Sequence, residues 1–165
     1  MIEKVECKAA IAVDETGVIT GTAWPFNAGP DQVGDLIERG AFHVAVADLP
    51  MLLAHDPEQP VGLWDEICES SEGLQVKGRL FVDESKRARA VRGLIHGGLI
   101  SGLSIGFVTK TATIRGRNRV ISALDLKEIS VVRNPAHPRA RIASAKSASA
   151  IAEAIERAAE ALRKL

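Results

Sequence analysis

The sequence predicts a β-rich α+β fold: a small closed or barrel-like, mostly antiparallel sheet flanked by helices, with an amphipathic helix at the C-terminus. Many short segments of apolar and β-branched residues are separated by turns rich in glycine, proline and asparagine, which is typical of strands in a β-rich core. About two internal segments have helical character. The 165 residues suffice for one domain with a short appendage.

Several strands are expected in the first half of the chain. Strands are predicted at 5–13 and 18–23, on either side of a turn that ends at Gly17. Pro25 should then take the chain out of the sheet, because proline has no N–H to donate to a central ladder. The next expected elements are a polar strand or turn at 35–40, a short helix at 41–47, an apolar strand at 51–54 and an alternating strand at 73–82.

The second half begins with the clearest internal helix. Over 83–96, Ala88, Val91 and Ile95 recur at helical spacing, and the glycines at 97 and 98 end the pattern. Strands should follow at 99–108, 109–114, 120–124 and 126–132, with a hairpin turn at 115–118.

The last part of the chain defines the expected domain organisation. Residues 143–150, ASAKSASA, have the composition of a flexible linker. Residues 151–165 carry apolar side chains at helical spacing, with acidic residues early and basic residues late, as the helix dipole favours. We therefore expect a main domain at 1–142, a linker at 143–150 and a helix at 151–165.

Composition and residue spacing argue against several classes of protein. Twenty-one basic residues balance twenty-one acidic ones, which argues against a protein that binds nucleic acid through a basic surface. Cys7 and Cys68 do not have the spacing of a metal site, and the sequence predicts no cofactor. No apolar run is long enough to cross a membrane and the N-terminus lacks a signal peptide, so the sequence predicts a cytoplasmic protein without a membrane partner.

His55 differs in its position from the other three histidines. It ends an apolar run and opens the loop HDPE, at a strand end where a reactive group meets solvent on a rigid support. His43, His96 and His137 have no such setting and are interpreted as packed or surface residues.

Ser104 lies between two glycines on a predicted strand. Residues two apart share a face, so Gly102 and Gly106 would leave Ser104 on a face without other side chains, open to a ligand or another backbone. The alternative is a glycine-rich strand that packs against a helix. The sequence GLSIG is not a nucleophile elbow, because no helix follows it.

Glu128 is a carboxylate within an apolar strand, on the same face as Leu126 and Ser130. Burying it is costly unless it is paired. It therefore either lies on an exposed sheet face or orients a histidine. The residues alone leave a Ser/His/Glu hydrolase as one of the alternatives.

Five short motifs occur in an order that resembles a known family. They are GAF at 40–42, LAHDP at 53–57, PVG at 60–62, GLSIGF at 102–107 and EISVVRNPA at 128–136. From about residue 20 to 142 the chain resembles the prohead (capsid maturation) proteases of HK97-type tailed phages, which also occur in prophages and gene transfer agents. The resemblance implies a fold shared with the herpesvirus assembly proteases.

The resemblance also implies an activity and its partners. Such a protein would be a serine endopeptidase that cuts scaffold segments from the major capsid protein inside the assembling prohead, in the cytoplasm of the bacterial host, and then cuts itself. Because the herpesvirus relatives are dimers, a homodimer is a further expectation.

The implied roles fall on the residues singled out above. Ser104 would be the nucleophile, His55 the general base and Glu128 the third member, where herpesvirus relatives have a second histidine. Arg133 and Asn134, which follow the strand of Glu128, are candidates for the oxyanion hole through a backbone amide or the Arg133 side chain. The alternative for Arg133 is a simple surface cation.

Other interpretations remain at this point. Self-cleavage within 143–150 would release the final helix, which could pack on scaffold helices or else dock on its own domain or a partner subunit. The chain could instead be a catalytically silent capsid-assembly or scaffold-binding module with the same fold. A barrel that binds an apolar ligand is disfavoured, because only four phenylalanines and two tryptophans are scattered through the chain.

Overall fold

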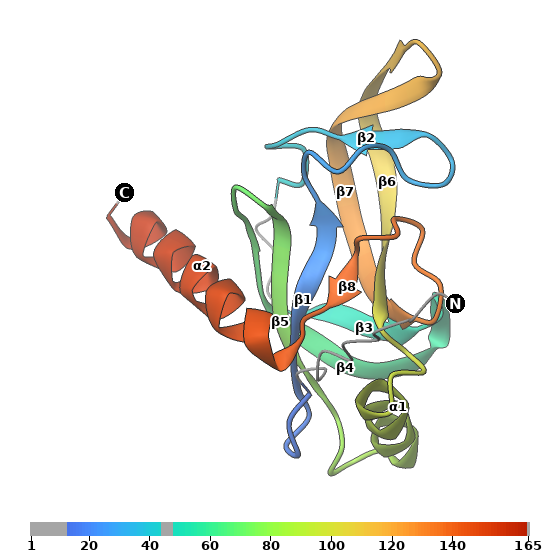
Figure 1. Cartoon of the computed structure of the whole chain (residues 1–165), viewed down its shortest axis with the longest axis vertical. Helices are drawn as coiled ribbons and strands as arrows, with labels where there is room; N and C mark the ends of the chain where they lie inside the picture. Colours follow the sequence, from blue (N-terminus) through green and yellow to red (C-terminus); the bar gives the residue numbers. More distant parts are fainter. Residues whose placement is uncertain (1–12, 44–47, 165) are drawn as a thin grey trace, which may run out of the picture.

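In the computed structural model, which describes residues 13–43 and 48–164, seven strands close into a barrel and an eighth pairs on its outside. The order around the barrel is β7-β3-β4-β5-β1-β8-β6 and back to β7, with β2 beside β7 (Figure 1). The strands are β1 (Val18–Pro25), β2 (Asp35–Ile37), β3 (Leu49–Leu53), β4 (Asp56–Glu69), β5 (Gly73–Leu80), β6 (Gly102–Arg115), β7 (Asn118–Val132) and β8 (Arg141–Ile142). Only β2 and β3 run parallel to their neighbour β7 in the described chain, which confirms the closed, mostly antiparallel sheet.

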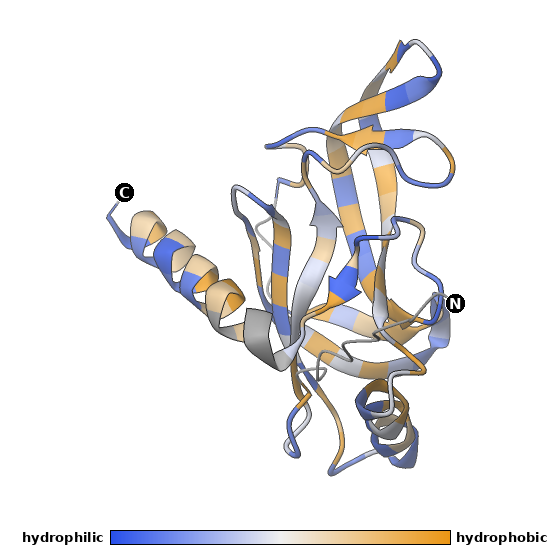
Figure 2. Ribbon diagram, in the orientation of Figure 1, coloured by the Kyte–Doolittle hydropathy of each residue, from blue (hydrophilic) through white to orange (hydrophobic). Residues whose placement is uncertain are grey.

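The barrel is filled by side chains that alternate inward along the strands. Figure 2 shows this alternation of polar and apolar residues along β5 and β7. Trp64 on β4 is fully buried, and its indole Nε1–H donates a hydrogen bond of 3.0 Å to the Ile129 carbonyl of β7. This contact joins two strands that are not neighbours in the sheet, so it ties the barrel together through its interior.

Helix α1 (Lys86–His96) packs on the barrel through the side chains that the spacing predicted. Ala88, Val91 and Ile95 are all buried. The helix begins three residues later than predicted, because Ser85 has an extended backbone and its hydroxyl caps the helix by accepting the Ala88 N–H at 3.2 Å.

The β6–β7 hairpin replaces four predicted strands by two long ones. Strands β6 and β7 stay paired from the barrel to the turn at 116–117, and the turn end of this hairpin projects beyond the barrel (Figure 1). Register shifts after Gly106 and on both sides of Thr111 are bulges, each of which inserts an unpaired residue. These bulges interrupt the period-two pattern, which is why the sequence suggested separate strands.

Two expectations for the first half need correction. Pro25 does not leave the sheet: it is the last residue of β1 and pairs with Gly73, at a strand end where a missing N–H is tolerated. The predicted helix at 41–47 starts instead as a turn at Ala41 and Phe42, both buried, while 44–47 lie outside the described residues. The predicted strand at 5–13 also lies there, except for Val13, which forms a bridge with Ile19.

Helix α2 (Ala145–Arg163) begins earlier than expected and takes in most of the segment interpreted as a linker. Its first half packs on the outside of the sheet, where Ile151 and Ile155 are buried with Ala143 and partly buried Cys68. The second half extends away from the barrel, and Leu162 is 71% exposed (Figure 1). None of the helices in the described chain is long and apolar enough to cross a membrane.

Candidate active site

His55 lies in a two-residue turn between β3 and β4. Leu53 pairs with Asp56, so Ala54 and His55 form the turn, and their φ angles are 50° and 63°. Positive φ at both central residues is the signature of a type I′ turn, whose twist suits a hairpin. A left-handed conformation costs roughly 1–2 kcal/mol for a residue other than glycine, so the surrounding structure must hold this turn in place.

Strand β7 holds it. The Ala54 N–H donates to the Val131 carbonyl at 3.2 Å, and the His55 N–H donates to the Ser130 hydroxyl at 2.9 Å. The turn therefore carries the imidazole of His55 over the β6–β7 pair at one fixed position, while 45% of its side chain stays exposed to solvent.

Ser104 lies on β6 within reach of this imidazole. Ser104 is 6% exposed, and its hydroxyl oxygen lies 2.9 Å from His55 Nε2. That is a hydrogen-bond distance across which a base can take a proton.

Glu128 lies on β7 on the other side of the imidazole. Its side chain is 13% exposed, and Oε1 lies 2.5 Å from His55 Nδ1. The hydrogen bond that His55 makes to Glu128 raises the pKa of His55 above its ordinary value; partial burial opposes this rise and the negative charge of Glu128 adds to it. Glu128 thus favours a protonated imidazole. The three residues, from the β3–β4 turn, β6 and β7, form one line of hydrogen bonds.

The space beside Gly102 and Gly106 is occupied, whereas the sequence predicted that it would be open. A β-carbon at Gly106 would lie 2.2 Å from Glu128 Oε1, and one at Gly102 would lie 2.6 Å from the Pro135 ring. The face of Ser104 is therefore not left free at these positions for a ligand or another backbone. It is filled by side chains of β7 and the segment that follows it.

Arg133 and Asn134 follow Val132, the last residue of β7, and both are exposed. Val132 pairs with Gly102, so the two residues lie beyond the end of β6 that precedes Ser104. The structure does not bring either side chain into the line of hydrogen bonds formed by the other three.

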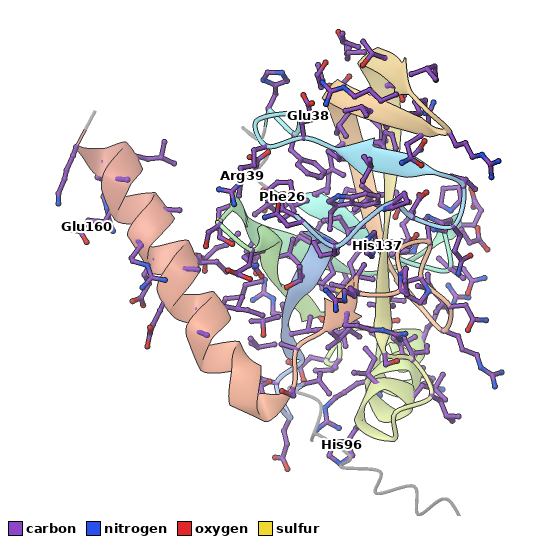
Figure 3. The ribbon with its side chains drawn as sticks, turned by 45° about the horizontal axis from the view of Figure 1, so that its top comes forward. Phe26, Glu38, Arg39, His96, His137 and Glu160 are labelled. Carbon is purple, nitrogen blue, oxygen red and sulfur yellow. The ribbon has the colours of Figure 1, made fainter. Side chains whose placement is uncertain are left out.

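Within the described residues, the other histidines and Cys68 take no part in this line of hydrogen bonds. His137 is 2% exposed; its Nδ1 accepts the Arg139 N–H, its Nε2 bonds to the Gly29 carbonyl, and its ring packs edge-on against Trp24. Figure 3 shows His137 within the body of the domain and His96 at the end of α1. Burial, together with the charge of Glu66, raises the pKa of the Cys68 thiol, which therefore stays neutral. Within residues 13–43 and 48–164, no group of three or more His, Cys, Asp or Glu side chains is placed to hold a metal ion.

Sequence reasoning gave no role to Ser130, although it named this residue on the face of Glu128. The structure shows it fully buried and bonded both to His55 and to Glu128. The available signal was its spacing, because a hydroxyl two residues along a strand from a carboxylate lies on the same face.

A family profile described as "Caudovirus prohead serine protease" matches residues 3–154. The chain belongs to this family. The prohead protease of Enterobacteria phage HK97 is 38% identical over 143 residues, which are 82% of this chain and 63% of that protein. A protein of Pseudomonas phage PAJU2 named "Capsid polyprotein" is 32% identical over 143 residues, 81% of this chain and 21% of that protein. This caudovirus prohead protease family member therefore spans less than two thirds of the length of either relative.

A solved structure shares its fold. The KSHV protease, crystallised in complex with a hexapeptide phosphonate inhibitor, superposes with a TM-score of 0.51 at 16% identity, over 86% of this chain and 77% of the other. The herpesvirus-protease-like fold predicted for this prohead protease family member is thus confirmed.

Proposed function

We propose that this protein is a serine endopeptidase that removes scaffold segments from the major capsid protein during prohead maturation and also cuts itself. The observation that supports this most is the line of hydrogen bonds from Ser104 through His55 to Glu128, with distances of 2.9 Å and 2.5 Å. It occurs in a chain that belongs to the prohead serine protease family. The same spatial logic of nucleophile, base and carboxylate recurs in hydrolases of unrelated folds.

In the proposed mechanism Ser104 is the nucleophile and His55 the general base. His55 Nε2 takes the hydroxyl proton while the Ser104 oxygen bonds to the carbonyl carbon of the scissile peptide. The imidazolium then gives this proton to the amine as the C–N bond breaks, which leaves an acyl-enzyme. A water molecule, deprotonated by His55 in turn, hydrolyses the ester and restores the Ser104 hydroxyl. Such general base catalysis contributes roughly 10²–10⁴ in rate.

Glu128 has two roles in this proposal. Its bond to Nδ1 keeps the proton on that nitrogen, so Nε2 is free to accept from Ser104. Its negative charge stabilises the imidazolium that forms in the transition state. The raised pKa of His55 agrees with such stabilisation.

The oxyanion hole is proposed at the segment after β7. The backbone amides of Arg133 and Asn134, or the Arg133 guanidinium, are the candidate donors, since they follow the residue that pairs with Gly102 on the strand of the nucleophile. Each donor to a developing oxyanion is worth about 3 kcal/mol.

The proposed partner is the major capsid protein with its scaffold segment, and the proposed location is the assembling prohead in the cytoplasm of the bacterial host. The names of the two phage relatives, a prohead protease and a capsid polyprotein, support a capsid protein as the partner. We propose no nucleic-acid or membrane partner, and a homodimer remains a proposal from the resemblance.

Self-cleavage is proposed within 143–150. Because α2 begins at Ala145, most of this segment is helical, whereas a protease cleft takes an extended chain. The first turns of α2 must therefore unwind before they can be cut. The helix can leave the sheet only by exposing Ile151 and Ile155, so cleavage should be slow.

The decisive experiment is co-expression with a capsid subunit that carries its scaffold segment, comparing wild type with Ser104→Ala by intact mass. Loss of an N-terminal capsid segment with the wild type alone supports the proposal. Cleavage by both proteins would move the nucleophile elsewhere, with Ser101 the next to test. Assembled shells without cleavage in either case would favour a catalytically silent assembly module.

A further inference from the structure

The buried hydroxyl of Ser130 lies where the turn that carries His55 meets the carboxylate that contacts its ring. Ser130 is fully buried on β7 and pairs directly with Ser104 on β6 and with Leu52 on β3. Its oxygen accepts the His55 backbone N–H at 2.9 Å, and its hydroxyl proton is donated to Glu128 Oε2 at 2.7 Å. One side chain therefore binds both partners of the Nδ1–Oε1 contact.

From this geometry we propose that Ser130 is a positioning residue that fixes His55 and Glu128 relative to each other. The inference rests on the proposed function. It concerns a residue that touches neither the hydroxyl of Ser104 nor, in the mechanism above, the substrate.

The carboxylate needs this second contact to keep its orientation. Glu128 uses Oε1 for His55 and Oε2 for Ser130, so both oxygens are occupied and the plane of the carboxylate is fixed. Without the Ser130 hydroxyl, Oε2 would be a largely buried anionic oxygen without that donor, and the carboxylate would rotate or shift to find another. Either movement changes the contact with His55 Nδ1.

The turn needs the same hydroxyl for a different reason. His55 has a left-handed backbone with φ of 63°, a conformation that must be held by its surroundings. The Ser130 oxygen binds the N–H of this residue, next to the bond from the Ala54 N–H to Val131. Losing it loosens the imidazole relative to Ser104, and displacements of about 1 Å near a reacting group can cost about a hundredfold in rate.

The test compares Ser130→Ala with wild type on a peptide that spans the junction mapped in the co-expression experiment. We expect kcat to fall about tenfold to a hundredfold with KM nearly unchanged, because no substrate contact is removed. Ser130→Thr keeps the hydroxyl and should recover most of the loss. The matched control is Thr20→Val, which also removes a buried hydroxyl, one without a hydrogen-bond partner in the described chain, and should leave both constants unchanged.

Several outcomes would overturn the proposal. One is a Ser130→Ala enzyme with wild-type kcat, even if it is less stable, since the hydroxyl would then be purely structural. Another is a Ser130→Thr enzyme that folds and is as slow as Ser130→Ala. If Ser130→Ala does not fold, hydrogen exchange on Ser104→Ala protein decides: the His55 amide should be protected by its bond to Ser130, and rapid exchange would contradict it. None of these results bears on whether wild type cleaves and Ser104→Ala does not, so the two proposals fail separately.

Discussion

Gly106 of β6 faces Glu128 of β7 so closely that a β-carbon at position 106 would lie 2.2 Å from Glu128 Oε1 and 2.8 Å from its carboxyl carbon. The two residues are paired in the antiparallel register, and the carboxylate folds back over the glycine toward His55. Only glycine leaves room for Glu128 in the position where it contacts Nδ1.

Gly106→Ala should therefore abolish most activity while leaving the fold intact. The atoms in the way belong to a side chain that can swing aside, so the barrel need not distort, but the carboxylate must leave Nδ1. We expect kcat/KM to fall about a hundredfold or more. Kinetics on the mapped junction peptide and a urea unfolding curve measure the two effects.

Gly93→Ala is the matched control. An added β-carbon there meets nothing within 4 Å, and Gly93 lies in the interior of α1. This variant should be about 1 kcal/mol more stable, since alanine is the better helix former, with unchanged kcat/KM. Full activity in Gly106→Ala would show that Glu128 is not needed where the structure has it.

The rate should depend on pH through His55. In the proposed mechanism only neutral His55 can accept the Ser104 proton, so activity should be lost as the pH falls through the pKa of His55, which the hydrogen bond to Glu128 raises above its ordinary 6.5. Glu128→Gln removes the charge and weakens the contact. The acidic limb of kcat/KM should then move to lower pH, and the plateau rate should fall.

Stability should follow the same titration with a definite sign. Because the folded protein binds the His55 proton more tightly than the unfolded chain does, this contribution is complete below the unfolded pKa and disappears as pH rises through the folded one. It should be small, since 45% of the His55 side chain is exposed. For the rate, an acidic limb of kcat/KM that stays at the same pH in Glu128→Gln would mean that a group other than His55 controls the loss of activity at low pH.

Trp64→Phe tests the contact through the barrel interior. The substitution removes the donor to the Ile129 carbonyl and leaves this buried acceptor with one partner fewer. We expect a loss of about 1–3 kcal/mol in the free energy of unfolding, measured in urea. A loss within about 0.5 kcal/mol, the range of neutral surface changes, would show that the bond contributes nothing.

The elements that the sequence predicted well are those whose pattern survives in the structure. The alternation over 73–82 corresponds to β5, and the spacing of Ala88, Val91 and Ile95 corresponds to the buried face of α1. The β6–β7 hairpin was split because bulges break its alternation. The start of α2 was missed because serine and alanine suit a linker as well as a helix, and packing of Ile151 and Ile155 decides between them.

The site, too, has a part that could be predicted from the sequence and a part that could not. The resemblance pointed to Ser104, His55 and Glu128, and the structure brings all three together. The turn that positions His55 was not predictable, since few residues other than glycine adopt positive φ and an alanine–histidine pair is not among the usual sequences of such a turn. The role proposed for Ser130 depends on which atoms meet across β3 and β7, a tertiary relationship that strand spacing alone does not contain.

Ile155→Ala tests whether docking of α2 controls self-cleavage. Ile155 is 4% exposed against the sheet, and removing its side chain should weaken docking by about 2 kcal/mol. A weaker contact exposes the first turns of α2 more often, so loss of the C-terminal fragment from purified protein should accelerate about tenfold or more, as followed by intact mass. Leu162→Ala is the control, because that side chain is 71% exposed and its loss should change neither stability nor cleavage. If adding Ser104→Ala to the Ile155→Ala and Leu162→Ala variants stops the loss of the C-terminal fragment in both, the protein cuts itself. If the Ile155→Ala chain stays at full length while its capsid substrate is cut, the segment 143–150 is not a cleavage site.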